Sequence, residues 1–222
     1  MNPNERIDAL RARLEAGRAV VDALPDPTGT EDPFELFASW YEVAESAGLM
    51  LAEAMTLSTV DTARRPSSRM VLLKGFDTRG FRFFTNLESR KAVEIAASPD
   101  VALCLHWTEL ERQVRIEGQA ERLPPQEAAA YFASRPRDSQ IGAWASAQSR
   151  PLESREALRE RVDHYEREFE GEEVPLPPQW GGYRVIPRLI EFWQGRPSRL
   201  HDRWVFTRES ADDAWRCARV QP

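Results

Sequence analysis

The sequence predicts an α+β domain in which short, mostly antiparallel strands form a small closed barrel with helices at its periphery. Three observations favour this fold class. At least seven segments from about residue 55 onward have the length and composition of short strands. The segment 77–80 between two of them has the composition of a hairpin turn. With 222 residues, 41% apolar and seven Trp, the chain can bury a core as one domain or two small ones.

The first 30 residues are expected to stand apart from this domain. Residues 5–16 have apolar residues at helical spacing, and the segment 24–30, which contains Pro and Gly, is expected to be a linker. We therefore divide the chain into an N-terminal helix with its linker, 1–30, and a main domain, 31–222. The first helix is expected to be mobile or to pack as an arm.

A second helix is expected to begin at Pro33. Asp32 has the side chain of an N-cap, Pro33 suits the first helical position, and Glu35 can complete a capping box. The apolar residues of this helix predict a broad buried face made of Phe34, Phe37, Trp40, Tyr41 and Ala44.

The rest of the chain is expected to alternate between strands and helices. Strands are expected at 55–60, 69–74, 81–84, 101–107, 113–121, 182–185, 189–193, 203–207 and 215–220. Helices are expected at 89–97, from Pro125 onward, and at 154–170. A polar turn is expected at 134–140.

Composition argues against several classes of protein. The chain has 36 acidic and 30 basic residues, a net charge of −6, which disfavours a sequence-independent nucleic-acid binder. It has no long apolar run and no signal-peptide pattern, so we expect a cytoplasmic protein without a membrane span. Cys104 and Cys217 form no CxxC pair and are expected to be reduced. The three histidines lack the spacing of a metal site, so no metal is expected.

The first candidate site lies between residues 69 and 91. Positive charge is supplied there by Arg69, Lys74, Arg90 and Lys91, and Ser89 precedes an expected helix. Cationic side chains near the start of a helix suit the binding of a phosphate. The alternative is a set of solvated surface charges. The apolar pair before Lys74 favours a site, because a partly buried ammonium needs an anionic partner. A regular strand would place Arg69 and Lys74 on opposite faces, unless it twists or lies at an interface.

A second candidate site lies in the helix-to-turn segment and consists of Tyr131, Arg135, Arg137, Ser139 and Gln140. A phenol, two guanidinium groups and a hydroxyl could bind a second small anion. Taken alone, this set is better explained by turn chemistry and a core Tyr.

A third candidate site follows the expected strand 189–193. Arg199, His201 and Arg203 alternate, so an extended segment would place them on one face with Leu200 pointing away. A His among arginines favours recognition of a planar or anionic ligand. No G-x-G-x-x-G, G-x-x-x-x-G-K-[ST] or G-x-S-x-G motif is present, which argues against Rossmann, P-loop and nucleophile-elbow sites.

Seven motifs, in order along the chain, resemble the pyridoxine/pyridoxamine 5′-phosphate oxidases, flavoproteins with the FMN-binding split-barrel fold. They are RMVLLK at 69–74, FFTNLESRK at 83–91, LERQV at 110–114, SRPRDSQIGAW at 134–144, PLPPQWGGY at 175–183, IEFWQG at 190–195 and RLHDR at 199–203. Each motif is short, but their collinearity from about Asp32 to the C-terminus makes the resemblance specific.

The resemblance implies a homodimer with FMN bound at the subunit interface. The positions that match FMN contacts are Arg69, Met70, Val71, Leu72, Leu73, Lys74, Phe84, Thr85, Arg90, Lys91, Gln113, Gln148, Ser149, Trp193 and Arg203. The positions that match substrate contacts are Lys74, Tyr131, Arg135 and Ser139 for the phosphate, and Arg199, Leu200 and His201 for the ring. Arg199 and His201 match the catalytic pair. An interface site would let one strand serve a pocket that the other subunit completes.

The implied activity is oxidation of pyridoxine 5′-phosphate or pyridoxamine 5′-phosphate to pyridoxal 5′-phosphate in vitamin B6 metabolism. A hydride equivalent passes from the substrate to the flavin, O2 reoxidises the flavin and releases H2O2, and the amine substrate also releases ammonia. Two alternatives stay open: a flavin oxidase of another substrate, as in the phenazine-pathway relatives, and a non-catalytic carrier of FMN or pyridoxal phosphate. The presence of all four substrate-phosphate positions argues against an oxidase of another substrate. The pair Arg199 and His201 argues against a non-catalytic carrier.

The chain departs from the family pattern in three places. Arg64 and Arg65 stand where the family usually has Gly, so that turn must differ or tolerate strain. Phe84 replaces a common Tyr, and residues 10–14 lack the Tyr that closes over the substrate in relatives.

Lys74 and Lys91 are the only lysines in the chain, which has 28 arginines. Both lysines match phosphate-binding positions of the family, which suggests that these positions need compact ammonium groups.

Overall fold

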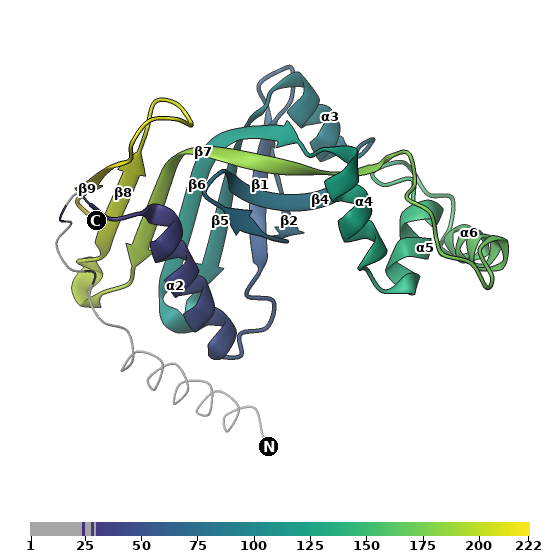
Figure 1. Ribbon diagram of the computed structural model, residues 1–222, viewed down its shortest axis with the longest axis horizontal. Coiled ribbons are helices and arrows are strands. Elements are labelled where there is room, and N and C mark those ends of the chain that lie inside the picture. The colour runs from purple at the N-terminus through teal and green to yellow at the C-terminus, as the bar shows by residue number, and fades with distance from the viewer. Residues whose placement is uncertain (1–23, 25–27, 29) are drawn as a thin grey trace.

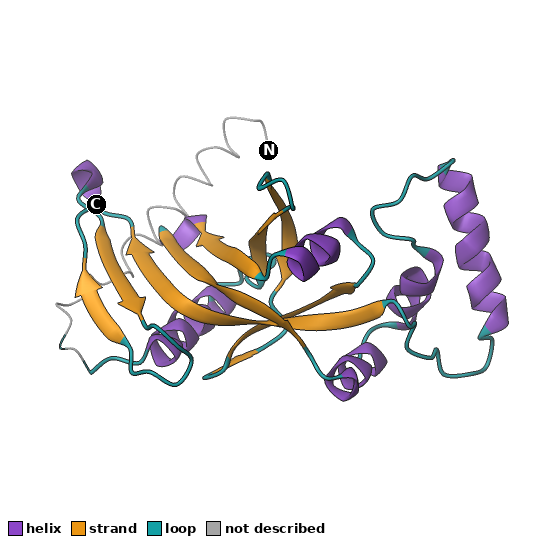
Figure 2. Ribbon diagram, turned by 90° about the horizontal axis from the view of Figure 1, so that it is seen from above, coloured by secondary structure: helices purple, strands orange, loops and turns teal. Residues whose placement is uncertain are grey.

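The structure, a computed structural model, describes Leu24, Thr28 and residues 30–222, and the expected helix at 5–16 lies outside these residues. The described chain forms one antiparallel sheet of nine strands with helices around it (Figures 1 and 2). The strands are β1 (Ala54–Val60), β2 (Pro66–Leu72), β3 (Phe76–Asp77), β4 (Gly80–Asn86), β5 (Asp100–Trp107), β6 (Arg112–Arg122), β7 (Trp180–Gln194), β8 (Asp202–Thr207) and β9 (Arg216–Arg219). The helices are α2 (Pro33–Ser46), α3 (Arg90–Ala97), α4 (Pro125–Ala133), α5 (Arg137–Ala145) and α6 (Arg155–Glu168), with 3-10 turns η1 (Thr108–Leu110) and η2 (Pro197–Arg199). None of these described helices is long and apolar enough to cross a membrane.

The sheet curls into a barrel that is split along one side. Neighbouring strands follow the order β2-β1-β5-β6-β7-β4-β3, while β8 pairs with β7 and β9 pairs with β8. Just after β2 the chain meets β4, where Lys74 N donates to Arg82 O and Arg82 N donates to Gly75 O, each at 2.8 Å. These two hydrogen bonds join the chain after β2 to β4, in place of a ladder between the two strands. The α+β fold class predicted from sequence, a small antiparallel split barrel with peripheral helices, is confirmed.

Strand β7 replaces two strands that the sequence predicted at 182–185 and 189–193. Pro187 interrupts the sequence pattern because proline has no N–H to donate to a ladder. In the structure the register between β6 and β7 shifts between Glu117 and Gly118, and Gly118 lies opposite Pro187. The prediction of two strands is wrong, because this bulge accommodates the proline within one continuous strand.

The turn between β1 and β2 shows the strain expected from the pair Arg64 and Arg65. Arg64 has a φ of +62°, a left-handed backbone conformation that side chains with a Cβ disfavour. The Asp61 carboxylate accepts hydrogen bonds from Ala63 N and Arg65 N at 2.9 Å and from Arg65 Nε at 2.8 Å. These bonds hold the turn and offset the strain at Arg64.

Helix α2 packs on the barrel with the face that its sequence predicts. Asp32 caps the helix, since its Oδ1 accepts a hydrogen bond from Phe34 N at 2.7 Å. The ring of Phe37 contacts that of Phe81 edge to face at 4.9 Å. The predicted face is buried at Phe34, Phe37, Trp40 and Ala44, and the partly buried Tyr41 packs against it.

Helices α4, α5 and α6 lie together at one end of the molecule, with a second, smaller core (Figure 2). The buried members of this core are Ala128, Phe132, Ile141, Phe169, Val174 and Trp180. Trp180 is the first residue of β7 and ties this core to the sheet. The turn expected at 134–140 is wrong in its second half, because α5 begins at Arg137 directly after Pro136. The polar residues there form the first turn of a helix, and the Gln140 amide donates to Phe132 O at 2.9 Å.

The substitution Gly118→Ala tests the bulge. A Cβ on Gly118 would lie 2.0 Å from Ile186 O, so the backbone would have to shift. We expect the free energy of unfolding to fall by about 1–3 kcal/mol, measured by urea unfolding with tryptophan fluorescence. Gly142→Ala is the matched control, because its Cβ meets nothing within 4 Å and Ala favours helix α5 by up to about 1 kcal/mol. A Gly118→Ala protein as stable as the wild type would contradict the close approach.

Candidate active site

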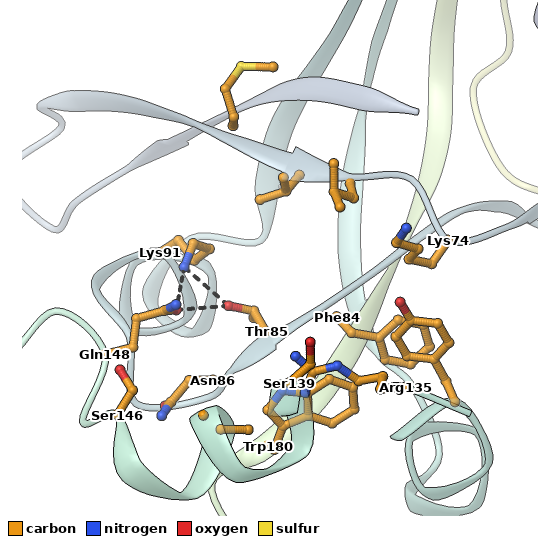
Figure 3. A pocket seen from close by; sticks show the side chains of 16 residues that line it. Lys74, Phe84, Thr85, Asn86, Lys91, Arg135, Ser139, Ser146, Gln148 and Trp180 are labelled. Atoms are coloured by element: carbon orange, nitrogen blue, oxygen red, sulfur yellow. Dashed lines mark hydrogen bonds between the residues drawn. The ribbon is translucent and has the colours of Figure 1, made fainter. Parts of the chain in front are cut away.

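A cavity of about 500 Å³, here called the first cavity, lies between the barrel and helices α4 and α5 (Figure 3). Its lining comes from segments far apart in the sequence: Met70, Val71, Leu72, Lys74, Phe84, Thr85, Asn86, Lys91, Tyr131, Arg135, Ser139, Gly142, Ala143, Ser146, Gln148 and Trp180. The structure thus brings together the residues predicted for the substrate phosphate and many of those predicted for the cofactor. In Figure 3, Lys91 lies on one side of this cavity, and Lys74 and Arg135 lie on the other.

Lys91 is a buried ammonium whose hydrogen-bond partners are all neutral. Its side chain lies in the first turn of α3 and is 9% exposed. The Nζ donates to Gln148 Oε1 at 2.7 Å, Thr85 Oγ1 at 3.1 Å and Ser89 Oγ at 3.2 Å. Burial, together with the nearby charge of Arg69, lowers the pKa of Lys91 to about 8. A buried cation of this kind, at the start of a helix, is stabilised by a bound anion.

Glu94 holds the two arginines that the sequence predicted beside Lys91. Its carboxylate is 5% exposed and accepts from Arg90 Nε at 2.7 Å and Arg69 Nη2 at 3.1 Å. Thr59 and Ser67 also donate hydroxyl hydrogen bonds to it. Burial raises the pKa of Glu94, but these hydrogen bonds outweigh burial and lower it to about 2. Arg69 and Arg90 do not line the first cavity, and the main chain N–H of Arg90 donates to Ser149 Oγ at 3.1 Å.

The end of β2 explains how Lys74 reaches the cavity. The expected strand 69–74 is wrong at its C-terminal end, since β2 stops at Leu72 and strand alternation does not extend to Lys74. Leu73 turns into the main core. Lys74 lines the first cavity, with its Nζ 3.5 Å from Glu53 Oε1, while Arg69 points to Glu94.

Aromatic rings form the wall of the first cavity on the side of Lys74 and Arg135. Phe84 stacks on Tyr131 at 4.1 Å and on Trp180 at 5.5 Å. The guanidinium of Arg135 lies over the Trp180 ring at 5.0 Å, and its buried Nη1 has no hydrogen-bond partner among the described residues. Burial lowers the pKa of Arg135. An unpartnered guanidinium nitrogen in a cavity that Ser139 also lines fits a small anion such as a phosphate.

Sequence reasoning missed Trp180 as a site residue. The motif that contains it, 175–183, was recognised, yet a Trp before two glycines gives no signal of a ring in a cavity wall. Asn86 and Ser146 were also missed, because their neighbours in the cavity come from other elements. Arg137, which the sequence grouped with Tyr131 and Arg135 in the second candidate site, lies outside the first cavity. Its guanidinium donates hydrogen bonds to Phe169 O and Glu172 O.

A second cavity of about 600 Å³ lies at the other end of β7, and its lining includes His106, Glu111, Trp193, Arg196 and His201. Trp193 and His201 are the predicted site residues that line it, and strand pairing places Gln113 and Arg203 on either side of Trp193. The His201 and Trp193 rings are 4.5 Å apart. Arg203 Nε donates at 2.8 Å to Glu191, whose carboxylate is buried. No group of three or more His, Cys, Asp or Glu side chains in the described part of the chain is placed to hold a metal.

The loop that carries Arg199 is a turn and not an extended segment. Residues 197–199 form η2, and Ser198 and Arg199 have φ values of +59° and +60°. The prediction that alternation places Arg199, His201 and Arg203 on one face is therefore wrong at Arg199. Two consecutive left-handed residues reverse the chain, and both Arg199 and Leu200 are exposed.

The two cavities cannot serve one ligand within one chain. Trp180 lines the first cavity and Trp193 lines the second, and they lie near opposite ends of the 15-residue strand β7. At the usual rise of a strand, the path between them is about 40 Å. The cofactor positions predicted from sequence are therefore separated: many line the first cavity, whereas Trp193 lines the second with Gln113 and Arg203 beside it on the sheet. Four further positions line neither cavity: Arg69, Leu73, Arg90 and Ser149.

Two family models cover most of the chain. Residues 45–167 match pyridoxamine 5′-phosphate oxidase, and residues 180–222 match the pyridoxine 5′-phosphate oxidase C-terminal dimerisation region. The second match begins at the first residue of β7 and includes the second-cavity residues Trp193 and His201.

Comparisons with individual proteins point to the same family. A pyridoxine/pyridoxamine 5′-phosphate oxidase of Rubrobacter xylanophilus is 53% identical over the full length of both chains. One from Burkholderia thailandensis is 56% identical, over 95% of this chain and 97% of its own. The crystal structure of PhzG from Burkholderia lata, in complex with tetrahydrophenazine-1-carboxylic acid, has a TM-score of 0.83 and 32% identity, over 91% of this chain and 99% of that one. An FMN-binding protein of Nostoc punctiforme shares the fold, with a TM-score of 0.72, 18% identity and coverage of 87% of this chain and 100% of its own. The chain therefore belongs to the pyridoxine/pyridoxamine 5′-phosphate oxidase family.

Proposed function

We propose that the chain is an FMN-dependent oxidase that converts pyridoxine 5′-phosphate or pyridoxamine 5′-phosphate to pyridoxal 5′-phosphate. The observation that carries this proposal is the first cavity, which has separate cationic groups on two sides, Lys91 on one and Lys74 with Arg135 on the other. A substrate phosphate and a cofactor phosphate each need such a group. Full-length relatives more than 50% identical carry this activity in their names.

The residues around Lys91 fit the phosphate of FMN. Lys91, Thr85, Gln148 and Ser149 would hold it at the start of α3, with Arg69 and Arg90 adding positive charge. When bound, FMN accepts a hydride equivalent from the substrate and passes electrons to O2, so H2O2 is released. The protein supplies binding and orientation.

The substrate phosphate would lie on the other side of the cavity. Arg135 has there a buried nitrogen without a hydrogen-bond partner in the described part of the chain, Ser139 adds a hydroxyl, and Lys74 adds an ammonium group. The stacked rings of Phe84, Tyr131 and Trp180 restrict this end to a narrow slot. Anchoring the phosphate fixes the position of the carbon that is oxidised.

The strands and the loop at the second cavity would supply the residues that act on the ring of the substrate, Arg199 and His201, together with the flavin contacts Gln113, Trp193 and Arg203. Because the two cavities lie at opposite ends of one strand, along which the path is about 40 Å, a complete site needs the second cavity of another copy. The match of 180–222 to a dimerisation region supports a homodimer of this kind. FMN would then lie at the subunit interface.

The alternative function is oxidation of a substrate without a phosphate, and the 32% identity to PhzG supports it. The complete set of Lys74, Tyr131, Arg135 and Ser139 in one cavity favours the B6 phosphates instead. The free thiols Cys104 and Cys217 agree with a cytoplasmic location, which we also propose.

The activity is tested by adding pyridoxine 5′-phosphate under air to the purified, FMN-loaded protein. We expect H2O2 and an aldehyde product to form in equal amounts. Arg199→Ala should lower kcat by at least about tenfold while changing the affinity for FMN by less than about twofold. FMN bound without product from either B6 phosphate would disprove the oxidase, and an equal loss of kcat and of FMN affinity would remove Arg199 from the catalytic pair.

The Lys91 site predicts how FMN affinity depends on pH. A bound phosphate stabilises the charged form of Lys91, whose pKa is about 8 in the free protein. Above that pH the free protein has lost the proton, so FMN binding must take up a proton and affinity should fall by up to about tenfold per pH unit. Fluorescence titration of the apo-protein with FMN measures this.

Lys91→Arg is the control for this pH dependence. Arginine keeps its charge, so the slope above pH 8 should disappear. Affinity at neutral pH should also fall, because a planar guanidinium does not fit the three oxygens around Nζ. A wild-type affinity that stays constant through about pH 9 would contradict the role of Lys91.

Mixed dimers test whether two copies build each site. Lys91→Ala damages the first cavity and Arg199→Ala damages the second, so each homodimer should be impaired. A heterodimer of the two variants, purified through two affinity tags, would have one site with both defects and one intact site. We expect about half of the wild-type activity per dimer. A heterodimer no more active than the better homodimer would mean that each site lies within one chain.

A further inference from the structure

The carboxylate of Asp202, the first residue of β8, joins three segments around the second cavity. Its side chain is 14% exposed, and each oxygen accepts a hydrogen bond from a different arginine. Arg196 Nε donates to Oδ2 at 2.7 Å, and Arg219 Nη1 donates to Oδ1 at 2.7 Å. Arg219 also donates through Nη2 to Leu24 O at 2.9 Å. Asp202 therefore links the loop after β7 to β9 and to the chain before α2.

The loop that Asp202 holds is strained. Ser198 and Arg199 both have left-handed backbone conformations, which residues with a Cβ adopt only where the surroundings impose them. The ion pair between Arg196 and Asp202 spans this turn, from the residue before η2 to the first residue of β8. It helps to hold the two ends of the loop together.

The same loop determines which nitrogen of His201 carries a proton. The main chain N–H of Arg196 donates to His201 Nδ1 at 3.1 Å. A nitrogen that accepts a hydrogen bond carries a lone pair, so the neutral ring has its proton on Nε2. The ring also rests against Trp193, at 4.5 Å between centroids.

We propose that Asp202 is a positioning residue that holds Arg196 and thereby fixes His201 as a hydrogen-bond donor through Nε2–H. In this arrangement His201 cannot take a proton from a substrate, because Nδ1 is engaged by Arg196 N and Nε2 already carries one. Its partner on the ligand is therefore a hydrogen-bond acceptor. The part that concerns the substrate rests on the proposed function, whereas the tautomer is a property of the protein alone.

The charges around Asp202 agree with this role. Burial raises the pKa of Asp202, but the hydrogen bonds and charges of Arg196 and Arg219 outweigh it and keep the pKa below its usual value. The carboxylate is therefore ionised throughout the neutral range and can hold both arginines.

The tautomer is measured by NMR of the protein labelled with 15N-histidine, in its dimeric, FMN-loaded form without substrate. The His201 signals are assigned by their loss in His201→Gln. We expect a pyridine-type shift for Nδ1 and a pyrrole-type shift for Nε2 in the neutral ring. A proton on Nδ1 would overturn the proposal, whatever the activity of the protein.

The substitution Asp202→Asn tests the positioning role. We expect kcat to fall by about 10- to 100-fold, as for other groups that orient a histidine, while the affinity for FMN changes by less than about twofold. The His201 signals should broaden or shift toward a mixture of tautomers. Asp212→Asn, at an exposed acid in the turn between β8 and β9, is the matched control and should change neither.

Arg196→Gln keeps the proposal testable if Asp202→Asn does not fold. It removes the ion pair with Asp202 but leaves the main chain N–H of residue 196 in place. We expect the same loss of kcat and the same spectral change, and Asp202→Glu should restore part of both in comparison with Asp202→Asn. Folded variants with unchanged His201 shifts and unchanged kcat would refute the role of Asp202. If no B6 phosphate is oxidised at all, the 15N shifts still decide the tautomer.

Discussion

The ladder of strand β7 with its neighbours is the constraint on which the rest of the structure depends. Along its 15 residues β7 pairs with β4 at its start, with β6 over most of its length and with β8 at its end. The bulge where Gly118 faces Pro187 keeps it one strand. Trp180 and Trp193 are thereby held at two cavities that a single ligand cannot span. Our proposal that a second copy of the chain completes each site rests on this separation.

Arginine has a recurring structural role in this protein. Three carboxylates with little exposed surface each hold two arginines: Glu94 with Arg69 and Arg90, Glu191 with Arg115 and Arg203, and Asp202 with Arg196 and Arg219. A planar guanidinium can bridge a carboxylate and other acceptors at once, which suits such fixed positions. Lys91 differs, because its three partners are neutral and its charge remains available for a ligand. These six arginines are held in ion pairs, whereas Lys91 lines the first cavity.

Local patterns predicted most elements and many of the site residues. The helix at Asp32 and Pro33, the alternation of β6 and the turn before β4 depend on neighbouring residues, so the sequence reveals them. The errors lie where contacts outside the usual turn and strand patterns matter. Pro187 stays within β7 because the register shifts opposite Gly118 of β6, and Arg199 lies in a left-handed turn spanned by the ion pair between Arg196 and Asp202. Neither contact is indicated by a local sequence pattern.

The sequence by itself determined the α+β class, the family and the residue types that we propose to bind phosphate, because helix caps, strand periods and short motifs are local properties. Only the tertiary structure decided how those residues are divided. It places Lys91 and Arg135 in one cavity and Trp193 and His201 in another. Near each cavity a carboxylate with little exposed surface, Glu94 or Asp202, forms ion pairs with two arginines. The physical reason is that strand register and side-chain burial depend on which strands and helices pack against each other. These contacts join residues that are far apart in the chain.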